Sequence, residues 1–275
     1  MKTPLKRRAH GGALLELAIA VSLCATVGCG VAVPLAAQVD LERERQTAMQ
    51  MSELRTVLLG YAMANGRLPC PADAHLPDAH PLAGREAAIV ANECAGGYSG
   101  AVPWATLGTP SIDAFGRRYR YRVARDLANG WDECHDRASA ADSPSICLTA
   151  PKPDSHPANA LALEVRERRR GGSLAAGSES IAAGLAVVLI SHGANGHFGT
   201  NTAGRAVAGD QHAVRDEARN AAPTTVSFMV RTRAPGQSGC DDDRAGAPLC
   251  AFDDLVRWIS RAELSRDLAR AEWAR

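Results

Sequence analysis

The chain has 275 residues, with 31 basic and 30 acidic side chains and a formal net charge of +1 at pH 7. This length allows one large domain or two small ones, and the near-zero net charge excludes a broad electrostatic field for binding nucleic acid. Aromatic residues make up only 4% of the chain, while alanine and glycine are abundant, a composition that suits long helices and loop-rich connections.

The chain begins with a basic leader, residues 1–11, that is followed by an apolar segment. Residues 12–39 carry no charged side chain apart from Glu16. As a helix this segment would be about 42 Å long, enough to span a hydrocarbon core of about 30 Å. We therefore expect a transmembrane helix over 12–39. The leader's basic residues predict a cytoplasmic N-terminus and an exported C-terminal body; they are Lys2, Lys6, Arg7 and Arg8.

Glu16 separates three interpretations of this segment. A secretory signal peptide would be cut near Ala36 or Ala37, but its apolar region should be short and free of acids. A simple membrane anchor explains the length but not the carboxylate, which costs about 2.5 to 3.5 kcal/mol near a bilayer core. The third interpretation, which accounts for both features, rests on a resemblance of the motif around Glu16 to a known family.

The stretch "RRAHGGALLELAIAVSL" resembles the N-terminus of type IV prepilins and type II secretion pseudopilins. The resemblance implies a cut by prepilin peptidase between Gly11 and Gly12, which makes Glu16 the fifth mature residue. In that family the carboxylate neutralises the N-terminal ammonium, usually methylated, of an adjacent subunit in a filament. The family usually begins with Phe, Met or Leu, where this chain has Gly12. A cut after Gly12, which would place Glu16 fourth, therefore stays open.

Residues 40–66 are expected to extend the same helix as a stem. "DLERERQTAMQ" is strongly charged and reads as a solvated helical face, and an apolar stripe with spacings of three and four follows it. Gly66 is a natural stop, so the whole helix would be about 80 Å long at about 1.5 Å per residue. The stripe consists of Met51, Leu54, Leu58 and Tyr61.

Residues 67–275 are expected to form an exported globular domain. Residues 118–123 alternate charged with apolar side chains, as in a half-buried strand, and residues 185–190 form an apolar run typical of a buried strand. A further strand is expected within 224–232, a last strand or short connection within 252–260, and a helix within 261–273. The predicted fold class is α+β: a long N-terminal membrane-spanning helix packed on a small antiparallel sheet.

Five motifs of the body are similar to a group of bacterial pseudopilin-like proteins. With the N-terminus, this resemblance covers most of the chain, but it implies no function specific to the group. The motifs are "GYAMANGRLPCPAD", "VPWATLG", "DAFGRRYRYRV", "LISHGANG" and "FDDLVRWIS".

Six of the eight cysteines lie beyond the apolar segment. An even set in an exported body predicts disulfides, whereas structural zinc sites favour C-x-x-C pairs, which this set lacks. Fifteen pairings are possible, and we expect the pairing of near neighbours because each bridge then closes a short loop. The expected pairs are Cys70–Cys94, Cys134–Cys147 and Cys240–Cys250.

Several motifs invite a functional interpretation beside a structural one. Ser191 and His192 are adjacent on a strand end and point to opposite sides, so a turn is a better account of them than a nucleophile and its base. His192 and His197 are read as a surface loop pair rather than as metal ligands. For calcium binding, which some pseudopilins show, the candidate is the acidic run 241–243. Both this run and the basic run 166–172 are instead interpreted as solvated loops.

Together these features predict a non-enzymatic structural subunit of a type II secretion or type IV pilus assembly, with no cofactor. Its partners would be other pilin-like subunits, prepilin peptidase and the bacterial inner membrane, with no nucleic acid. The expected location is a single pass of that membrane with the body in the periplasm, in a pilus or pseudopilus. The alternative is a membrane-anchored exported binding module that does not polymerise.

Overall fold

A computed structural model of the chain describes residues 12–128, 162–210 and 214–273, with the side chains of 12–37 outside the described part. The chain divides into two compact units, Met1–Arg45 and Gln46–Arg275. Helix α1 spans Gly12–Asn65, so the division falls within it. Its last residue, Asn65, directly precedes Gly66, the predicted stop.

No helix in the described part of the chain is long and apolar enough to cross a membrane. The prediction of a membrane-spanning helix is therefore wrong for the part of the chain that the structure describes. The side chains of α1 that the structure describes include the charged run over 40–45, which is largely exposed, as expected of the solvated face of the stem. The cleavage site at Gly11 and Gly12 and the side chain of Glu16 lie outside the described side chains.

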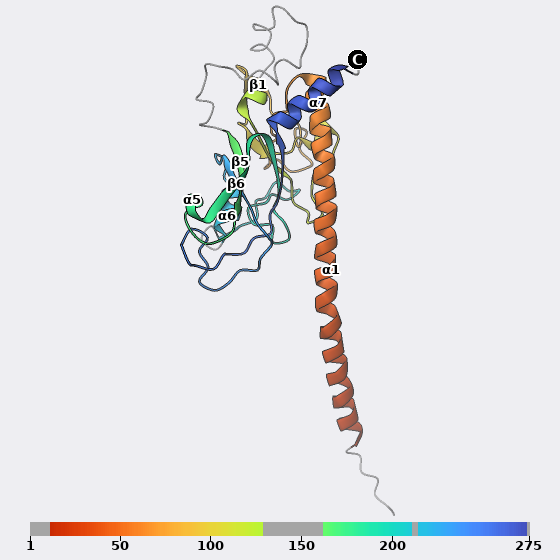
Figure 1. The fold of residues 1–275 in the computed structure, drawn as a ribbon. Helices are drawn as coiled ribbons and strands as arrows, with labels where there is room; N and C mark the ends of the chain where they lie inside the picture. Colours follow the sequence, from red (N-terminus) through yellow and green to blue (C-terminus); the bar gives the residue numbers. More distant parts are fainter. Residues whose placement is uncertain (1–11, 129–161, 211–213, 274–275) are drawn as a thin grey trace, which may run out of the picture. The chain divides into compact units, whose positions relative to one another are not determined.

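The body, Gln46–Arg275, is built on one six-stranded mixed sheet and a small hairpin (Figure 1). The hairpin pairs β1 with β2, and short helical segments α2, η1 and α5 lie between the strands. The first elements are β1 (Ile89–Val90), β2 (Glu93–Cys94), β3 (Ser99–Ala101), α2 (Trp104–Leu107), β4 (Arg120–Val123) and η1 (Arg125–Leu127). The later elements are β5 (Leu163–Arg168), α5 (Leu174–Gly177), β6 (Ser178–Ser191), α6 (Arg215–Ala221), β7 (Ser227–Val230), β8 (Leu255–Ser260) and α7 (Arg261–Trp273).

The long strand β6 is the centre of the sheet. The strand order is β3-β4-β6-β5-β7, and β8 also pairs with β6. Val187 of β6 pairs with Val123 of β4 and with Ile259 of β8, so these two strands flank β6 on opposite sides. The apolar run at 185–190 is buried in β6, as its composition predicts.

The expectation of a purely antiparallel sheet is wrong at one pair. Strands β5 and β7 run parallel, with Val165 opposite Phe228. A parallel pair needs a long crossover connection, and here the chain passes through β6 and α6 before it reaches β7. Alternation along a single strand carries no information about such a crossover.

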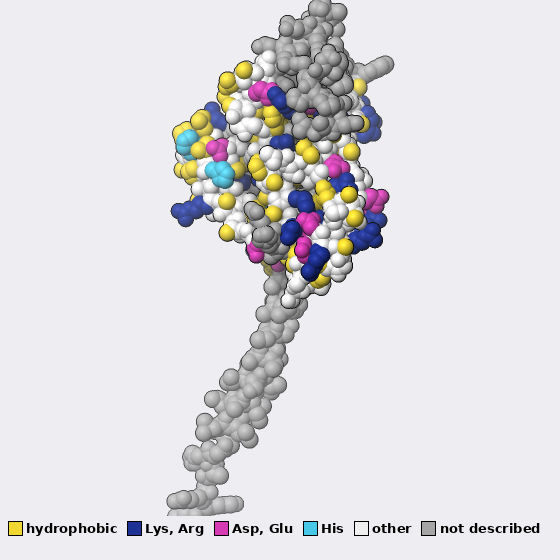
Figure 2. Space-filling view, turned by 90° about the vertical axis from the view of Figure 1, so that its left-hand side faces the viewer, with side chains coloured by type: hydrophobic (Ala, Val, Ile, Leu, Met, Phe, Trp, Pro, Cys, Tyr) yellow, Lys and Arg dark blue, Asp and Glu magenta, His cyan; other side chains and the backbone are white. Residues whose placement is uncertain are grey.

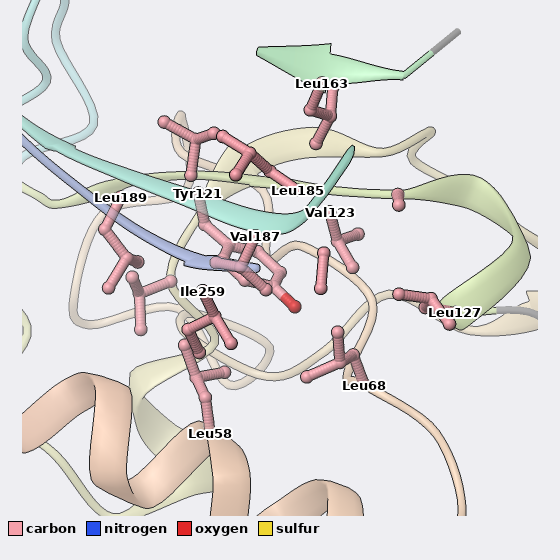
Figure 3. Close-up of a cluster of buried hydrophobic side chains, with 14 of the residues drawn as sticks. Leu58, Leu68, Tyr121, Val123, Leu127, Leu163, Leu185, Val187, Leu189 and Ile259 are labelled. Carbon is pink, nitrogen blue, oxygen red and sulfur yellow. The ribbon is translucent and has the colours of Figure 1, made fainter. Parts of the chain in front are cut away.

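The end of α1 packs on one face of this sheet. Met51, Leu54 and Leu58 of the predicted stripe are at most 2% exposed. Figure 3 shows Leu58 beneath the side chains of Val187 and Ile259, which belong to the same apolar cluster. The helix is therefore part of the body's core over these residues. Burial of apolar area of this kind supplies the main favourable free energy of folding.

The last helix closes the core beside α1. Leu264 of α7 is 1% exposed and belongs to the same apolar cluster. Arg55 of α1 forms an ion pair with Glu263 of α7. On the face drawn in Figure 2, basic and acidic side chains are interspersed with small apolar areas, and neither sign covers that face. This pattern agrees with the near-zero net charge of the sequence.

We predict that Leu58→Ala lowers the free energy of unfolding of the full chain by about 2 to 5 kcal/mol, because it removes a fully buried side chain and leaves a cavity. Urea unfolding followed by circular dichroism measures the loss. Leu82→Ala is the matched control, since Leu82 is 58% exposed and its truncation should change stability by no more than about 0.5 kcal/mol. Equal losses for the two variants would contradict this assignment of the core.

Candidate functional site

Three buried carboxylates meet at one end of the sheet. Glu217 comes from α6, and Asp253 and Asp254 precede β8 directly. One carboxylate oxygen of each residue lies within 4.8 Å of those of the other two. We call these three residues the carboxylate cluster. Buried carboxylates are uncommon unless they are paired or coordinate a cation, so the cluster is the strongest candidate site in the described part of the chain.

Strand pairing brings the three carboxylates together. Ser191, the last residue of β6, pairs with Leu255, the first residue of β8. The turn after β6 therefore lies beside Asp253 and Asp254. Helix α6 is fastened to the same place because Asn220 donates to Asp254 Oδ2 at 2.8 Å and to the carbonyl oxygen of Met229 in β7 at 3.0 Å.

Backbone and amide groups hold the carboxylates in place. Asn195 donates through its backbone N–H to Asp253 Oδ2 at 2.8 Å and through its side chain to Glu217 Oε1 at 3.0 Å. The backbone N–H of Asp253 donates to Glu217 Oε1 at 2.9 Å. Asp253 Oδ1 has no hydrogen-bond partner and is shielded from solvent. These bonds position the cluster, and the positive charge of Arg233 also acts on Asp253.

Two histidine rings contact the cluster. His192 Nδ1 lies 3.2 Å from Asp254 Oδ1, and His197 Nδ1 lies 3.3 Å from Glu217 Oε2. His192 is 1% exposed, so the interpretation of it as part of a surface loop pair is wrong. The two rings approach different carboxylates rather than each other.

Burial makes the ionised form of the cluster costly. Burial, and next the charge of Asp254, raise the pKa of Glu217 to about 8, although the hydrogen bond from Asn195 works in the opposite direction. Burial also raises the pKa of Asp253, against the effect of the Asn195 backbone N–H. Carboxyl groups with such raised pKa values gain from any positive charge that enters the site.

A second buried group of charges is centred on Asp216, which is also a residue of α6. Asp216, the neighbour of Glu217, contacts Arg168 Nε at 2.7 Å and Arg231 Nη1 at 3.5 Å. Arg231 also contacts Asp242 Oδ1 at 2.8 Å. We call these four residues, Arg168, Asp216, Arg231 and Asp242, the arginine–aspartate network. Its two positive and two negative side chains balance one another.

This network overturns two of the sequence-based interpretations. Asp242 is fully buried, and Asp243 is paired with Arg219 at 3.0 Å, so residues 241–243 are not a solvated acidic loop. Their carboxylates are already neutralised by arginines and are not available as calcium ligands. The basic run 166–172 was also expected to be solvated, but Arg168 is a buried residue of β5. Hydropathy did not predict burial at either place because the buried charges form ion pairs with one another.

Ser191 forms its hydrogen bond with a carboxylate, Asp113, and not with a histidine. Its hydroxyl donates to Asp113 Oδ2 at 2.5 Å, while His192 approaches Asp254. Burial raises the pKa of Asp113, and the hydrogen bond from Ser191 opposes that rise. Ser191 and His192 thus serve two different carboxylates, as their opposite directions at the end of a strand predict.

Two disulfides fasten loops of the body. Cys70–Cys94 and Cys240–Cys250 have Cα–Cα distances of 5.6 and 5.0 Å, and both are pairs of near neighbours. The Cys240–Cys250 loop is also tied to the arginine–aspartate network, since the backbone N–H of Cys250 donates to Asp242 Oδ1 at 2.9 Å. The third expected pair, Cys134–Cys147, lies outside the described residues.

The carboxylate cluster was not identified from the sequence. Asp253 and Asp254 stand in "FDDLVRWIS", which was interpreted as a strand or short connection, and Glu217 stands in the unremarked segment "RDEARN". The available signal was a pair of acids directly before an apolar strand, a place where side chains become buried. Comparison with protein-family models, curated proteins and solved structures finds no match to this chain.

We predict that Gly193→Ala destabilises the body strongly. Gly193 has φ +56°, and an added Cβ would lie 2.3 Å from the carbonyl oxygen of Asp253 and 2.6 Å from its Oδ1. The matched control is Gly97→Ala, at φ +77° with no atom within 4 Å of the added Cβ. The positive φ alone costs about 1 to 2 kcal/mol, so we expect the Gly193 variant to lose at least twice as much stability as the control in urea unfolding. Similar losses would show that the close approach to Asp253 is unimportant.

Proposed function

We propose that this chain is a pilin-like structural subunit of a type II secretion or type IV pilus assembly, cut by prepilin peptidase. The observation that carries the proposal is the position of α1. The described helix spans Gly12–Asn65, and its last turns lie in the core of an α+β body. A continuous helix between a processed N-terminus and a compact body is the arrangement that the resemblance implies for pilin-like subunits.

The disulfides support export of the body. Disulfides form and persist in oxidising compartments and are rare in a reducing cytosol. Cys70–Cys94 and Cys240–Cys250 each close a loop with little regular structure of its own. In the proposal, residues 67–275 face the periplasm, and the two bridges stabilise loops that a reducing compartment would leave open.

Glu16 supports assembly rather than simple anchoring. A carboxylate in an apolar segment is costly unless an opposite charge accompanies it. In the proposal that charge is the N-terminal ammonium that cleavage creates on an adjacent subunit. The pairing would set the register between subunits, and it would exist only after the leader, residues 1–11, has been removed.

We predict that prepilin peptidase removes the leader. Expression with and without the peptidase should give two products that differ by residues 1–11, measured by mass spectrometry of the intact chain. Gly11→Val should block a cut after Gly11, whereas Gly12→Val should block a cut after Gly12, so the pair of variants identifies the site. An unchanged N-terminus in both strains, or a cut near Ala37, would refute the proposal.

We predict that Glu16→Gln impairs co-purification with other pilin-like subunits at least tenfold, because it removes the charge and keeps the shape. Glu16→Asp is the matched control, since it keeps the charge and should retain part of the assembly. Both variants should still be cut and should retain the two disulfides, which non-reducing peptide mapping checks. Normal processing with unchanged assembly in Glu16→Gln would favour the alternative, an exported binding module that does not polymerise.

A further inference from the structure

The carboxylate cluster brings three buried acidic side chains together, and the charge of Arg233 acts on one of them, Asp253. Glu217, Asp253 and Asp254 are 0%, 9% and 6% exposed. Their backbone and amide hydrogen-bond donors carry no net charge, and the contacting rings of His192 and His197 are at most singly charged. Ionised carboxylates that are taken out of water need compensation by full charges, because neutral dipoles alone rarely offset the loss of hydration.

Asp253 adds a second and independent observation. Its Oδ2 accepts the backbone N–H of Asn195, but its buried Oδ1 has no partner. Buried polar atoms in folded proteins are nearly always satisfied, so an orphaned carboxylate oxygen next to two other carboxylates calls for an unseen positive partner. A bound cation would both give this oxygen a partner and reduce the repulsion among the three carboxylates.

The neighbouring arginine–aspartate network provides an internal comparison. Asp216 and Glu217 are consecutive and both fully buried. Around Asp216 the chain supplies Arg168 and Arg231 as built-in cations. Around Glu217 it supplies amides, backbone N–H groups and histidines. The same short helix therefore carries one acid that contacts two arginines and one that lies against two further acids.

We propose that Glu217, Asp253 and Asp254 bind one hard divalent cation, of the Ca²⁺, Mg²⁺ and Mn²⁺ class. Carboxylate oxygens are the ligands that these ions prefer, whereas thiolates and imidazoles favour softer metals. The carboxylate oxygens lie within 4.8 Å of one another, which is close enough for one ion to contact all three residues. Water and backbone oxygens would complete the coordination.

The groups around the carboxylates suit this role as outer partners. His192 and Asn220 contact Asp254, and Asn195 contacts both Asp253 and Glu217. Such contacts orient the ligand carboxylates while leaving other lone pairs for the ion. A bound cation would join α6 to the start of β8, two segments whose acids otherwise repel each other. This inference does not depend on the proposed pilin-like function.

The test is thermal unfolding and isothermal titration calorimetry of the purified full chain after treatment with EDTA. We expect Ca²⁺, Mg²⁺ or Mn²⁺ to bind at one ion per chain, and to raise Tm by about 5 to 10 °C at a hundredfold excess over Kd. The three ions are titrated separately, so that the order of their affinities identifies the preferred one. Zn²⁺ is included as the soft competitor.

Glu217→Gln and Asp253→Asn should each lose the Tm shift and weaken binding at least tenfold. Without cation, both variants should unfold close to the wild-type Tm, because each keeps the shape of the side chain and removes one acidic group from the cluster, and this readout distinguishes a lost ligand from a misfolded body. Glu179→Gln is the matched control, since the Glu179 side chain is 66% exposed, and it should respond like the wild type.

Three results would overturn the proposal. The first is the absence of any shift with the three hard cations at millimolar concentration, which would mean that protons shared within the cluster balance its charge. The second is an equal shift in Glu217→Gln and the wild type, which would place the ion elsewhere. The third is a response to Zn²⁺ alone, which would assign the metal to the histidines. Cleavage of the leader is measured separately, so either proposal can fail without the other.

Discussion

The contact between α1 and the central strand is the interaction on which the rest of the body depends. Leu58 of the helix meets Val187 of β6 and Ile259 of β8 in one apolar cluster. The flanking strands β4 and β8 both hold β6, so the face that receives the helix is shared by three strands. Most of the stability of a helix in a protein comes from packing of this kind rather than from its own propensity, and these contacts define the part of α1 that belongs to the body.

The burial of charged side chains is the second constraint, and two consecutive acids of α6 meet it in different ways. Asp216 is neutralised by Arg168 and Arg231, which fastens the Cys240–Cys250 loop to the sheet through Asp242. Glu217 faces two further acids instead. Replacing a balanced buried ion pair by apolar residues is often neutral for stability, whereas removing one partner is severe. The network therefore fastens the loop to the sheet, whereas the carboxylate cluster, in which three acids face one another, is the place where we propose that a cation binds.

The sequence predicted those parts of the fold in which hydropathy reports burial directly. The stripe over Met51, Leu54 and Leu58 and the apolar run of β6 were correct because a buried apolar face leaves a periodic signal. Strand β5 was missed because Arg168 is buried only through partners 48 and 74 residues away in the chain. The same reason hid the carboxylate cluster: what marks Glu217 as unusual is its distance to Asp253 and Asp254, and sequence spacing does not contain that distance.

The carboxylate cluster and the core are connected through β8. Asp253 and Asp254 stand at the start of this strand, Ile259 near its end enters the core beside Leu58, and α7 follows at once. Repulsion among the acids acts against the strand's first residues, whereas its pairing with β6 and the burial of Ile259 act in favour of the strand. A cation at the cluster would remove the opposing term without changing the core. If the proposed cation binds, its occupancy would therefore favour the pairing of the first residues of β8 with β6, and through this strand it would be coupled to the core.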